Sequence, residues 1–568
     1  MPETLLPTTI RARVHEDAIS RVTRFFNATT VETLNELFQN ARRAGATRVD
    51  VTIADGEVRV ADDGEGIARP AALLAFGQSR WDADTARRED PAGMGVYALA
   101  RRPKVTIRSR PRPADGHRLP AWEVHLTPEH FLGKRDAAVS IIDAATLPFG
   151  TEIVFDDEKA NTGSVDIAAE HFPLPVTCNG SDVERRDFLH DAIHIEHWRG
   201  IRLGVRSVSH HPGRGPELNF HGIRIENVRL PVIASMESHW YVKADVVDCA
   251  ELELVLPARK AIVETRFVEQ LRNACRTAIY HAMLKVDKQI SVPAEVRADA
   301  LSHGVDLPIA RAELARWWPT YANEYSTKRE DPHRTALPDR PIVVEADIPP
   351  CDQVALWRAA RRSDISHRLC AEEPRYRGYP WYDSLPKVKK VTTRVVLQGV
   401  LDGEELSIEE QRTRHVPFHT ARPERITFVL ETIDGDGAIE HVCIPADVAF
   451  GDDDVSWPDD VGVLVTEKSD ITPDELADLM YDAYFSPSDD CEADSYETQQ
   501  DDYRQAAQSK ALELLASAEE AMLSNVRTAV YRSILQHLPR DRDTIIRIRR
   551  DKPIEITIEP AETENDTA

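Results

Sequence analysis

Two short motifs near the N-terminus bring together residues that could hold and act on a ligand. Glu36 and Asn40 are four residues apart, so on a helix a carboxylate and an amide would project from one face. The run Asp62-Asp-Gly64-Glu-Gly66 sets a carboxylate before two glycines, which let the backbone turn sharply and approach a ligand. Asp62 would accept a hydrogen bond from a buried donor.

Two further motifs contain glycine. Gly93 and Gly95 end a polar loop and open a helix predicted over 96–100. A loop that enters a helix N-terminus can bind phosphate, because free N–H groups and the helix dipole face the anion. Further along, Gly150-Thr151 begins a predicted strand.

Each motif alone has an ordinary explanation. A D-x-G-x-G run is most often a loop turn, and a Glu/Asn pair on a helix is usually a solvated face. The four motifs occur here in one fixed order and on elements of the right type. Their combination therefore favours a nucleotide site over turn chemistry alone.

The elements that position these motifs have clear signals. Residues 29–45 are expected to form a helix, with Thr29 and Glu32 spaced as a capping box and Gly45 as its C-terminal cap. Two alternating runs flank Asp55-Gly56, which predicts a β-hairpin ending at Asp62. Further elements are expected as a short helix over 71–76 and strands over 105–110, 122–126 and 151–155.

The ordered set resembles the GHKL superfamily, which includes DNA gyrase B subunits, large heat-shock chaperones, sensor histidine kinases and MutL. The N-box is Glu36-Leu-Phe-Gln-Asn40, and the stretch ELFQNARRAGATRVDV is most similar to the MutL and MORC style. Where MutL proteins usually carry an acidic residue before A-G-A-T, this chain has Arg43. The resemblance implies a Bergerat-type fold, an α/β sandwich with helices on one face of a mixed sheet.

The resemblance also implies roles for individual residues. Asp62 would accept from the adenine amine, Thr151 would assist through a water, and Asn40 would bind Mg²⁺. Glu36 would orient or deprotonate the attacking water. Residues 77–92 would form a lid over ATP. The remaining expected nucleotide contacts are Gly64, Gly66, Ile67, Gly93, Met94, Gly95 and Val96.

A second segment is predicted to alternate strands from about residue 165 and to end in an amphipathic helix, Phe267–Val286. Leu252, Leu254 and Leu256 alternate along one predicted strand, and the loop Pro257-Ala-Arg259-Lys260 follows it. This arrangement resembles the transducer domain of MutL and its relatives. The resemblance implies that Lys260 or Arg259 neutralises charge on the γ-phosphate; the alternative is an ordinary basic loop.

The fold class expected for the whole chain is α+β. The sequence divides into a GHKL ATP-binding domain over 1–160, a transducer-like domain over 161–290, a linker or α+β region over 291–400, a β-rich region over 401–485, and 486–568 with an acidic linker, a long helix and terminal strands. The long helix is predicted over Gln505–Leu538. Aromatic residues in 291–400 favour packing over a binding surface.

Length and charge limit the function classes. The chain has 568 residues and a formal net charge of −26, which does not favour generic nucleic-acid binding. Seven scattered cysteines favour reduced thiols over disulfides. No apolar run suits a membrane span or a signal peptide, so the cytoplasm is expected.

We therefore expect an ATP-binding and Mg²⁺-dependent ATPase that closes its lid and dimerises through its N-terminal domain, as a clamp or chaperone-like machine does. Its client remains unidentified from the sequence. One alternative is a non-catalytic scaffold switched by ATP. The other is a histidine-kinase-type phosphotransferase, which the single His15 before the N-box helix does not favour.

Overall fold

Helices and strands alternate along most of the chain in a computed structural model, which confirms the predicted α+β class. The structure describes residues 29–75, 95–113, 119–209, 215–225, 228–255, 261–321, 333–397, 405–407, 422–451, 457–488, 494–517 and, with interruptions, 519–560. The chain divides into two units, Met1–Ala310 and Arg311–Ala568, and each is described by itself. Across the described residues, no helix is both long and apolar enough to cross a membrane.

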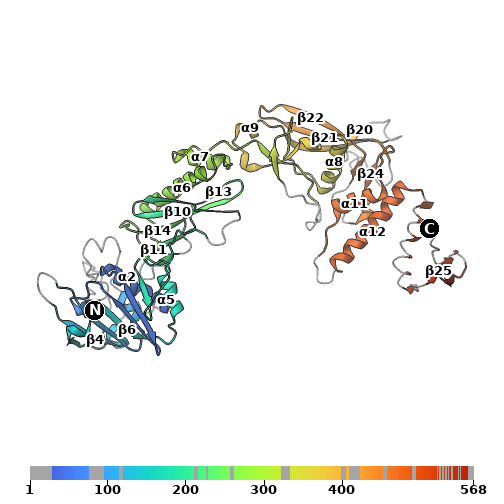
Figure 1. The fold of residues 1–568 in the computed structure, drawn as a ribbon. Coiled ribbons are helices and arrows are strands. Elements are labelled where there is room, and N and C mark those ends of the chain that lie inside the picture. The colour runs from blue at the N-terminus through green and yellow to red at the C-terminus, as the bar shows by residue number, and fades with distance from the viewer. Residues whose placement is uncertain are drawn as a thin grey trace, which may run out of the picture. The chain divides into compact units, whose positions relative to one another are not determined.

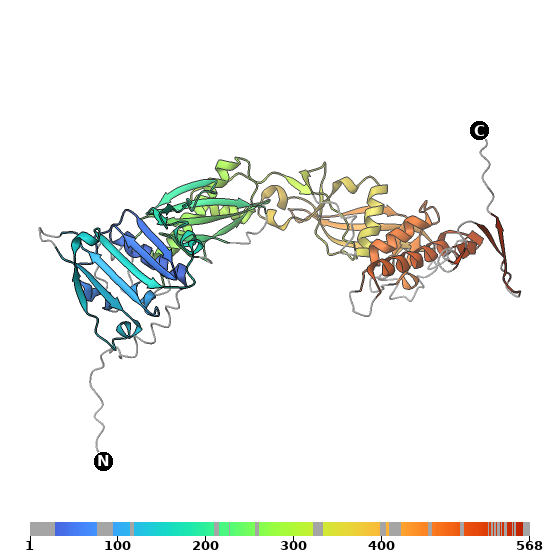
Figure 2. The same cartoon turned by 60° about the horizontal axis from the view of Figure 1, so that its bottom comes forward.

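The first unit begins with a mixed sheet, drawn in blue and cyan in Figure 2. Its eight strands have the order β5-β4-β3-β6-β2-β1-β7-β8. β1 runs parallel to β7, and the other neighbours are antiparallel. The strands are β1 (Val49–Ala54), β2 (Glu57–Asp62), β3 (Val105–Arg110), β4 (Ala121–Leu126), β5 (Val139–Ile142), β6 (Gly150–Asp156), β7 (Val176–Cys178) and β8 (Ser181–Asp182).

Helices α2 (Thr30–Arg43) and α5 (Thr162–Ala169) pack together beside this sheet (Figure 1). Leu34 and Phe38 of α2 share one apolar core with strand residues such as Val60. This core holds α2 against the strands that carry the glycine motifs. Short helices also occur in this part: η1 (Pro70–Leu74), η2 (Gly95–Leu99), α4 (Pro128–Phe131) and η3 (Ala144–Thr146).

The local signals in the first motifs are confirmed. The Thr29 hydroxyl accepts from the Glu32 amide while the Glu32 carboxylate accepts from the Thr29 amide, which completes a capping box at the start of α2. Gly45 follows the helix with φ +68°, as a C-terminal cap requires. Asp55 and Gly56 both have positive φ between β1 and β2, as a type I′ hairpin turn demands.

Three predicted elements differ in detail. The helix expected over 96–100 is the 3₁₀-helix η2, and the described part of the short helix expected over 71–76 is the 3₁₀-helix η1. The region near residue 165, expected to begin a run of strands, lies in α5, whose start Asn161 caps through its side chain.

A second sheet in the first unit has the order β12-β11-β14-β10-β9, with β13 paired to β14. Its strands are β9 (His194–Trp198), β10 (Ile201–Val208), β11 (Glu217–Phe220), β12 (Ile223–Ile225), β13 (Val232–Ala234) and β14 (His239–Val246). The helix α6 (Arg266–Val286) confirms the predicted amphipathic helix and packs on β9, β10 and β14, while α7 (Ala294–Ser302) follows it. In the strand expected over Leu252–Leu256, Leu254 forms an isolated bridge with Ile262, and Leu256 lies outside the described residues.

The second unit contains a sheet in the order β18-β17-β19-β21-β22, with β20 paired to β19. Its strands and helices are β15 (Glu313–Ala315), β16 (Arg334–Ala336), β17 (Ile342–Val344), α8 (Pro350–Arg362), η4 (Ser366–Arg368), β18 (Leu369–Ala371), η5 (Pro374–Tyr376), α9 (Pro380–Asp383), β19 (Lys387–Leu397), β20 (Glu405–Ser407), β21 (Pro423–Ile433), β22 (Ile439–Ala446), β23 (Val448–Phe450), η7 (Pro458–Asp460), β24 (Val463–Val465), α11 (Pro473–Tyr484), α12 (Tyr496–Leu515), β25 (Arg542–Arg547) and β26 (Glu555–Pro560).

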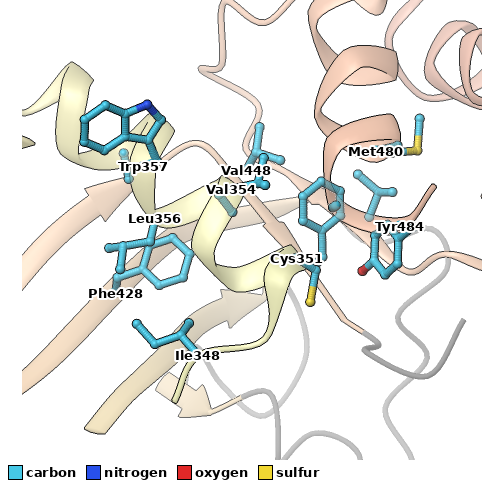
Figure 3. Packing of buried hydrophobic residues seen from close by; sticks show 14 of the residues in the cluster. Ile348, Cys351, Val354, Leu356, Trp357, Phe428, Val448, Met480 and Tyr484 are labelled. Atoms are coloured by element: carbon cyan, nitrogen blue, oxygen red, sulfur yellow. The ribbon is translucent and has the colours of Figure 1, made fainter. Parts of the chain in front are cut away.

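Aromatic and aliphatic side chains pack around α8 in this unit. Figure 3 shows Leu356 of α8 near Phe428 of β21 and Cys351 of α8 near Tyr484 of α11. Trp357 is also buried, and the rings of Trp318 and Trp357 have centroids 4.7 Å apart. The predicted packing role is confirmed for these tryptophans. Tyr325, another aromatic of this region, lies outside the described residues.

The prediction for the long C-terminal helix is wrong in its bounds. Ser495 caps α12 through its side chain, so the helix starts within the stretch predicted as an acidic link and ends at Leu515. Ala516 is extended and interrupts the predicted helix, and the residues described between Glu519 and Val530 are helical again, with Met522 and Val526 exposed. The predicted terminal strand pair is confirmed as the hairpin β25–β26.

Candidate nucleotide-binding site

The centre of the site is the junction between the end of β2 and the start of β6. Asp62 pairs with Thr151 in the antiparallel register, and the Asp62 carboxylate accepts from the amides of Gly64, at 2.9 Å, and Thr151. Burial raises the pKa of Asp62 to about 6; these two hydrogen bonds act against that rise, and the charge of Asp63 adds to it. A carboxylate that is costly to keep charged without a partner is suited to accept from a ligand donor.

The glycine loop after Asp62 is fixed from two sides. The Glu65 amide donates to the Ala44 carbonyl at the end of α2 with 2.8 Å between nitrogen and oxygen. On the other side the Trp122 indole donates to the Ile67 carbonyl, also at 2.8 Å. A Cβ at Gly64 would lie 2.7 Å from the Ala44 oxygen and 2.9 Å from an Asp62 carboxylate oxygen. Gly64 thus keeps this carboxylate accessible and lets the loop contact α2.

A buried serine that the sequence interpretation missed organises the same junction. The Ser109 hydroxyl on β3 accepts from the Ile67 amide at 2.8 Å and donates to the Gly150 carbonyl at 3.0 Å. Its oxygen lies 3.3 Å from the Thr151 hydroxyl. The alternation along β3 placed Ser109 on the core face of a strand, and a polar residue there was the signal that could have identified it.

Gly66 and Gly150 are required by close packing. Gly66 has φ +72°, and a Cβ there would lie 2.9 Å from the Arg110 carbonyl oxygen. Gly150 has φ +122°, and a Cβ there would lie 1.9 Å from the Asp62 carbonyl oxygen. The two glycines therefore allow the loop, β3 and β6 to meet at the Asp62 carboxylate.

The N-box helix presents Glu36 and Asn40, both half-buried, one turn apart on α2. The loop contact at Ala44 brings the C-terminal end of this helix to the glycine loop. The Asn40 amide oxygen accepts from the Arg43 guanidinium with 3.2 Å between oxygen and nitrogen. Asn40 thus supplies a hard oxygen ligand of the kind Mg²⁺ uses, with a cation already beside it.

The other predicted site residues divide between described and undescribed parts. Gly95 and Val96 form the first residues of η2, which contacts α2. Gly93, Met94, Arg259 and Lys260 lie outside the described residues, as does the whole predicted lid, residues 77–92. The structure therefore brings together the Asp62, Gly64, Gly66, Ile67 and Thr151 group and connects it to the helix of Glu36 and Asn40.

The chemistry of these residues can be compared with what an adenine nucleotide and its Mg²⁺ ion need. The Asp62 carboxylate, held by backbone amides and kept accessible by Gly64, matches an acceptor for an exocyclic amine. For Mg²⁺, the described N-box residues offer the Asn40 oxygen, and the Arg43 charge is adjacent to it.

Comparison with known proteins found related sequences. DNA mismatch repair proteins MutL from Brucella abortus (strain S19), Brucella melitensis biotype 2 (strain ATCC 23457) and Brucella suis biovar 1 (strain 1330) are each 34% identical over 214 residues. The match covers 30% of this chain and 33% of each relative, so the chain matches about a third of the length of these curated proteins. No family model matches the chain. This partial match to MutL confirms the resemblance to the GHKL superfamily that the motifs indicated.

Proposed function

We propose that this protein binds ATP with Mg²⁺ at the Asp62 junction and hydrolyses it, using residues 1–160 as the ATP-binding domain and 161–290 as a transducer. The observation that supports this most is the buried Asp62 carboxylate, which accepts from the Gly64 and Thr151 amides beside a loop attached to the N-box helix. Similarity to MutL supports the same conclusion.

The adenine end of the site would use direct and indirect contacts. Asp62 would accept from the exocyclic amine, and the Thr151 hydroxyl would hold a water that bridges to the base. The Ser109 hydroxyl, 3.3 Å from that of Thr151, would keep the threonine oriented. Backbone groups of Gly64, Gly66 and Ile67 would line the base, while Gly93 to Val96 would donate to the phosphates.

The N-box helix would supply the reacting end. Glu36 would orient or deprotonate the attacking water, and Asn40 one turn later would hold the metal ion through its amide oxygen. Bound Mg²⁺ would neutralise charge on the phosphate oxygens. Lys260 or Arg259 would approach the γ-phosphate when the transducer is engaged, as a further cation.

The test compares nucleotide binding and steady-state ATPase in the wild type, Glu36→Ala and Asp62→Asn. The wild type should turn over slowly, about once per second or less. Glu36→Ala should bind ATP without hydrolysing it, and Asp62→Asn should do neither well. Glu57→Gln, an exposed carboxylate on β2, is the matched control and should behave as wild type.

Each outcome separates the alternatives. Equal hydrolysis in wild type and Glu36→Ala would remove Glu36 from its role. Tight binding with no hydrolysis in the wild type would favour the non-catalytic scaffold, and transfer of label from [γ-³²P]ATP to a histidine would favour the phosphotransferase. No binding of ATP at all would overturn the proposed function.

We further propose that ATP closes the lid and drives dimerisation through the N-terminal domains. Light scattering after gel filtration should show a monomer with ADP and a dimer with a non-hydrolysable ATP analogue. An unchanged mass would contradict the clamp or chaperone-like cycle and leave ATP binding untouched. Asp62→Asn should stay monomeric with the analogue, which serves as the control.

The relatives are mismatch repair proteins by name, which raises the question of DNA. The net charge of −26 does not favour DNA along the whole surface, so a contact would need a local basic site. ATPase assays with and without duplex DNA at low and moderate salt test this point. We expect no stimulation; a salt-sensitive stimulation would assign DNA as the partner.

A further inference from the structure

The last turn of the N-box helix contains a cation next to the residue that would bind the metal. Arg43 follows Asn40 by three residues, so both side chains lie on one side of α2. The Arg43 guanidinium donates to the Asn40 amide oxygen, 3.2 Å away. Both side chains are half-buried, which reduces the screening of the Arg43 charge by water.

The atom that Arg43 contacts is the one a metal needs. An asparagine side chain has one oxygen acceptor, while its nitrogen only donates. A second lone pair on that oxygen could coordinate a metal ion, but the arginine charge beside it would repel a divalent cation. An arginine keeps its charge at every pH at which proteins are usually studied. Arg43 and Mg²⁺ therefore compete at the same oxygen.

Backbone contacts tie the end of α2, next to Arg43, to the glycine loop. The next residue, Ala44, accepts from the Glu65 amide of the glycine loop, and the Ala44 amide donates to the Asn40 carbonyl. Moving the end of α2 would break the contact that holds the loop beside Asp62. The positive side chain also suits the C-terminal end of a helix, where the dipole is negative. The backbone at Arg43 is thus held beside the glycine loop.

We infer that Arg43 partly replaces Mg²⁺ in nucleotide binding, which deepens and rests on the proposed function. The guanidinium supplies positive charge at the place where the metal would hold the phosphates, and it lowers the affinity of Asn40 for the ion. ATP then binds this protein with little dependence on Mg²⁺. Removal of the arginine charge makes binding depend on the metal.

The test measures the dissociation constant of ATP for the full chain by calorimetry, first in excess Mg²⁺ and then in EDTA. The readout is binding and not hydrolysis. The ratio of the dissociation constant in EDTA to that in Mg²⁺ should be within a few-fold of one in the wild type. In Arg43→Ala the ratio should rise by about tenfold or more. Arg42→Ala, the adjacent arginine in the same turn, is the control and should keep the wild-type ratio.

Arg43→Gln separates charge from hydrogen bonding. The glutamine amide can still donate to Asn40 but is neutral, so its ratio should follow that of Arg43→Ala. It also replaces Arg43→Ala if the latter fails to fold. A wild-type ratio in Arg43→Gln, or a ratio in Arg43→Ala equal to wild type, would overturn the inference while ATP binding stood. Loss of ATP binding in the wild type under both conditions would instead overturn the proposed function.

Discussion

Replacement of Asp62 by asparagine should stabilise the protein without nucleotide while it weakens ATP binding. The reason is the cost of keeping this carboxylate charged. Burial raises its pKa from 3.8 to about 6 in the folded protein, against the hydrogen bonds from the Gly64 and Thr151 amides. At neutral pH the folded state must hold a charge that the unfolded chain solvates freely. Asparagine has nearly the same shape and no charge.

The pKa change sets the magnitude and the pH range. Between pH 3.8 and about 6 the folded protein binds a proton at Asp62 that the unfolded chain has lost, so stability falls as pH rises through this range. A change from 3.8 to about 6 corresponds to about 3 kcal/mol at neutral pH. Asp62 keeps part of its surface exposed and accepts two hydrogen bonds, so the expected gain is about 1 to 3 kcal/mol.

The assay is native-state hydrogen exchange at the amides of β2 and β6, corrected for intrinsic rates, at pH 4 and pH 7.5. This measurement reports the local stability of the sheet around Asp62. Unfolding of the whole chain would average that stability with the stability of other parts. The free energy of opening at these amides should be larger in Asp62→Asn than in the wild type at pH 7.5, and equal in the two proteins at pH 4. A variant that is no more stable at pH 7.5, or a difference that does not change with pH, would refute the reasoning.

Asp63 provides a matched control with the opposite sign. Burial opposes its charge, but hydrogen bonds from the Thr47 hydroxyl and from the Thr47 and Arg48 amides outweigh burial and lower its pKa. Its charged form is favoured by folding, and this stabilisation is lost as pH falls through the lowered pKa. Asp63→Asn should therefore destabilise the folded protein at pH 7.5.

Two other predictions concern how the site is held together. Gly150→Ala should cost more than about 3 kcal/mol, because its Cβ would lie 1.9 Å from the Asp62 carbonyl oxygen; Gly45→Ala, also at positive φ but with nothing within 4 Å, should cost about 1 to 2 kcal/mol. Urea unfolding of both variants measures this, and equal losses would contradict it. Gln39→Leu should cost about 1 to 3 kcal/mol, since the buried Gln39 amide donates to the His221 carbonyl at 2.5 Å. Hydrogen exchange in β11 and β12 should quicken, and unchanged exchange would argue against this contact.

The parts of the site that the sequence predicted correctly have local causes. A capping box needs two residues three apart, and a type I′ turn needs Asp55-Gly56 between alternating runs, so α2 and the β1–β2 hairpin could be identified from short windows. The pairing of Asp62 with Thr151 was implied only by family resemblance. Its physical basis is the β2–β6 register across about ninety intervening residues, which no short window contains.

The parts that were missed or misjudged depend on distant neighbours or on element length. Ser109 is an ordinary strand residue until β6 and the glycine loop meet over its hydroxyl. The helix predicted after Gly95 is a 3₁₀-helix of five residues, and a window this short does not distinguish the two helix types. In α12 the apolar pattern beyond Leu515 suggested a continuous helix, while the extended Ala516 ends it. Periodicity alone does not show where packing stops.

Helix α2 connects three parts of the proposed cycle, which are the residues for hydrolysis and the metal, the contact with the second sheet, and the glycine loop. Glu36 and Asn40 would serve hydrolysis and metal binding, while Gln39, between them, is buried against the turn after β11 of the second sheet. The end of the same helix holds the glycine loop at Ala44. Because a helix moves as a rigid body over one turn, a shift of Asn40 toward a bound phosphate would also move the Gln39 contact. Nucleotide occupancy and the position of the second sheet would then be coupled through α2, independently of the loop around Lys260.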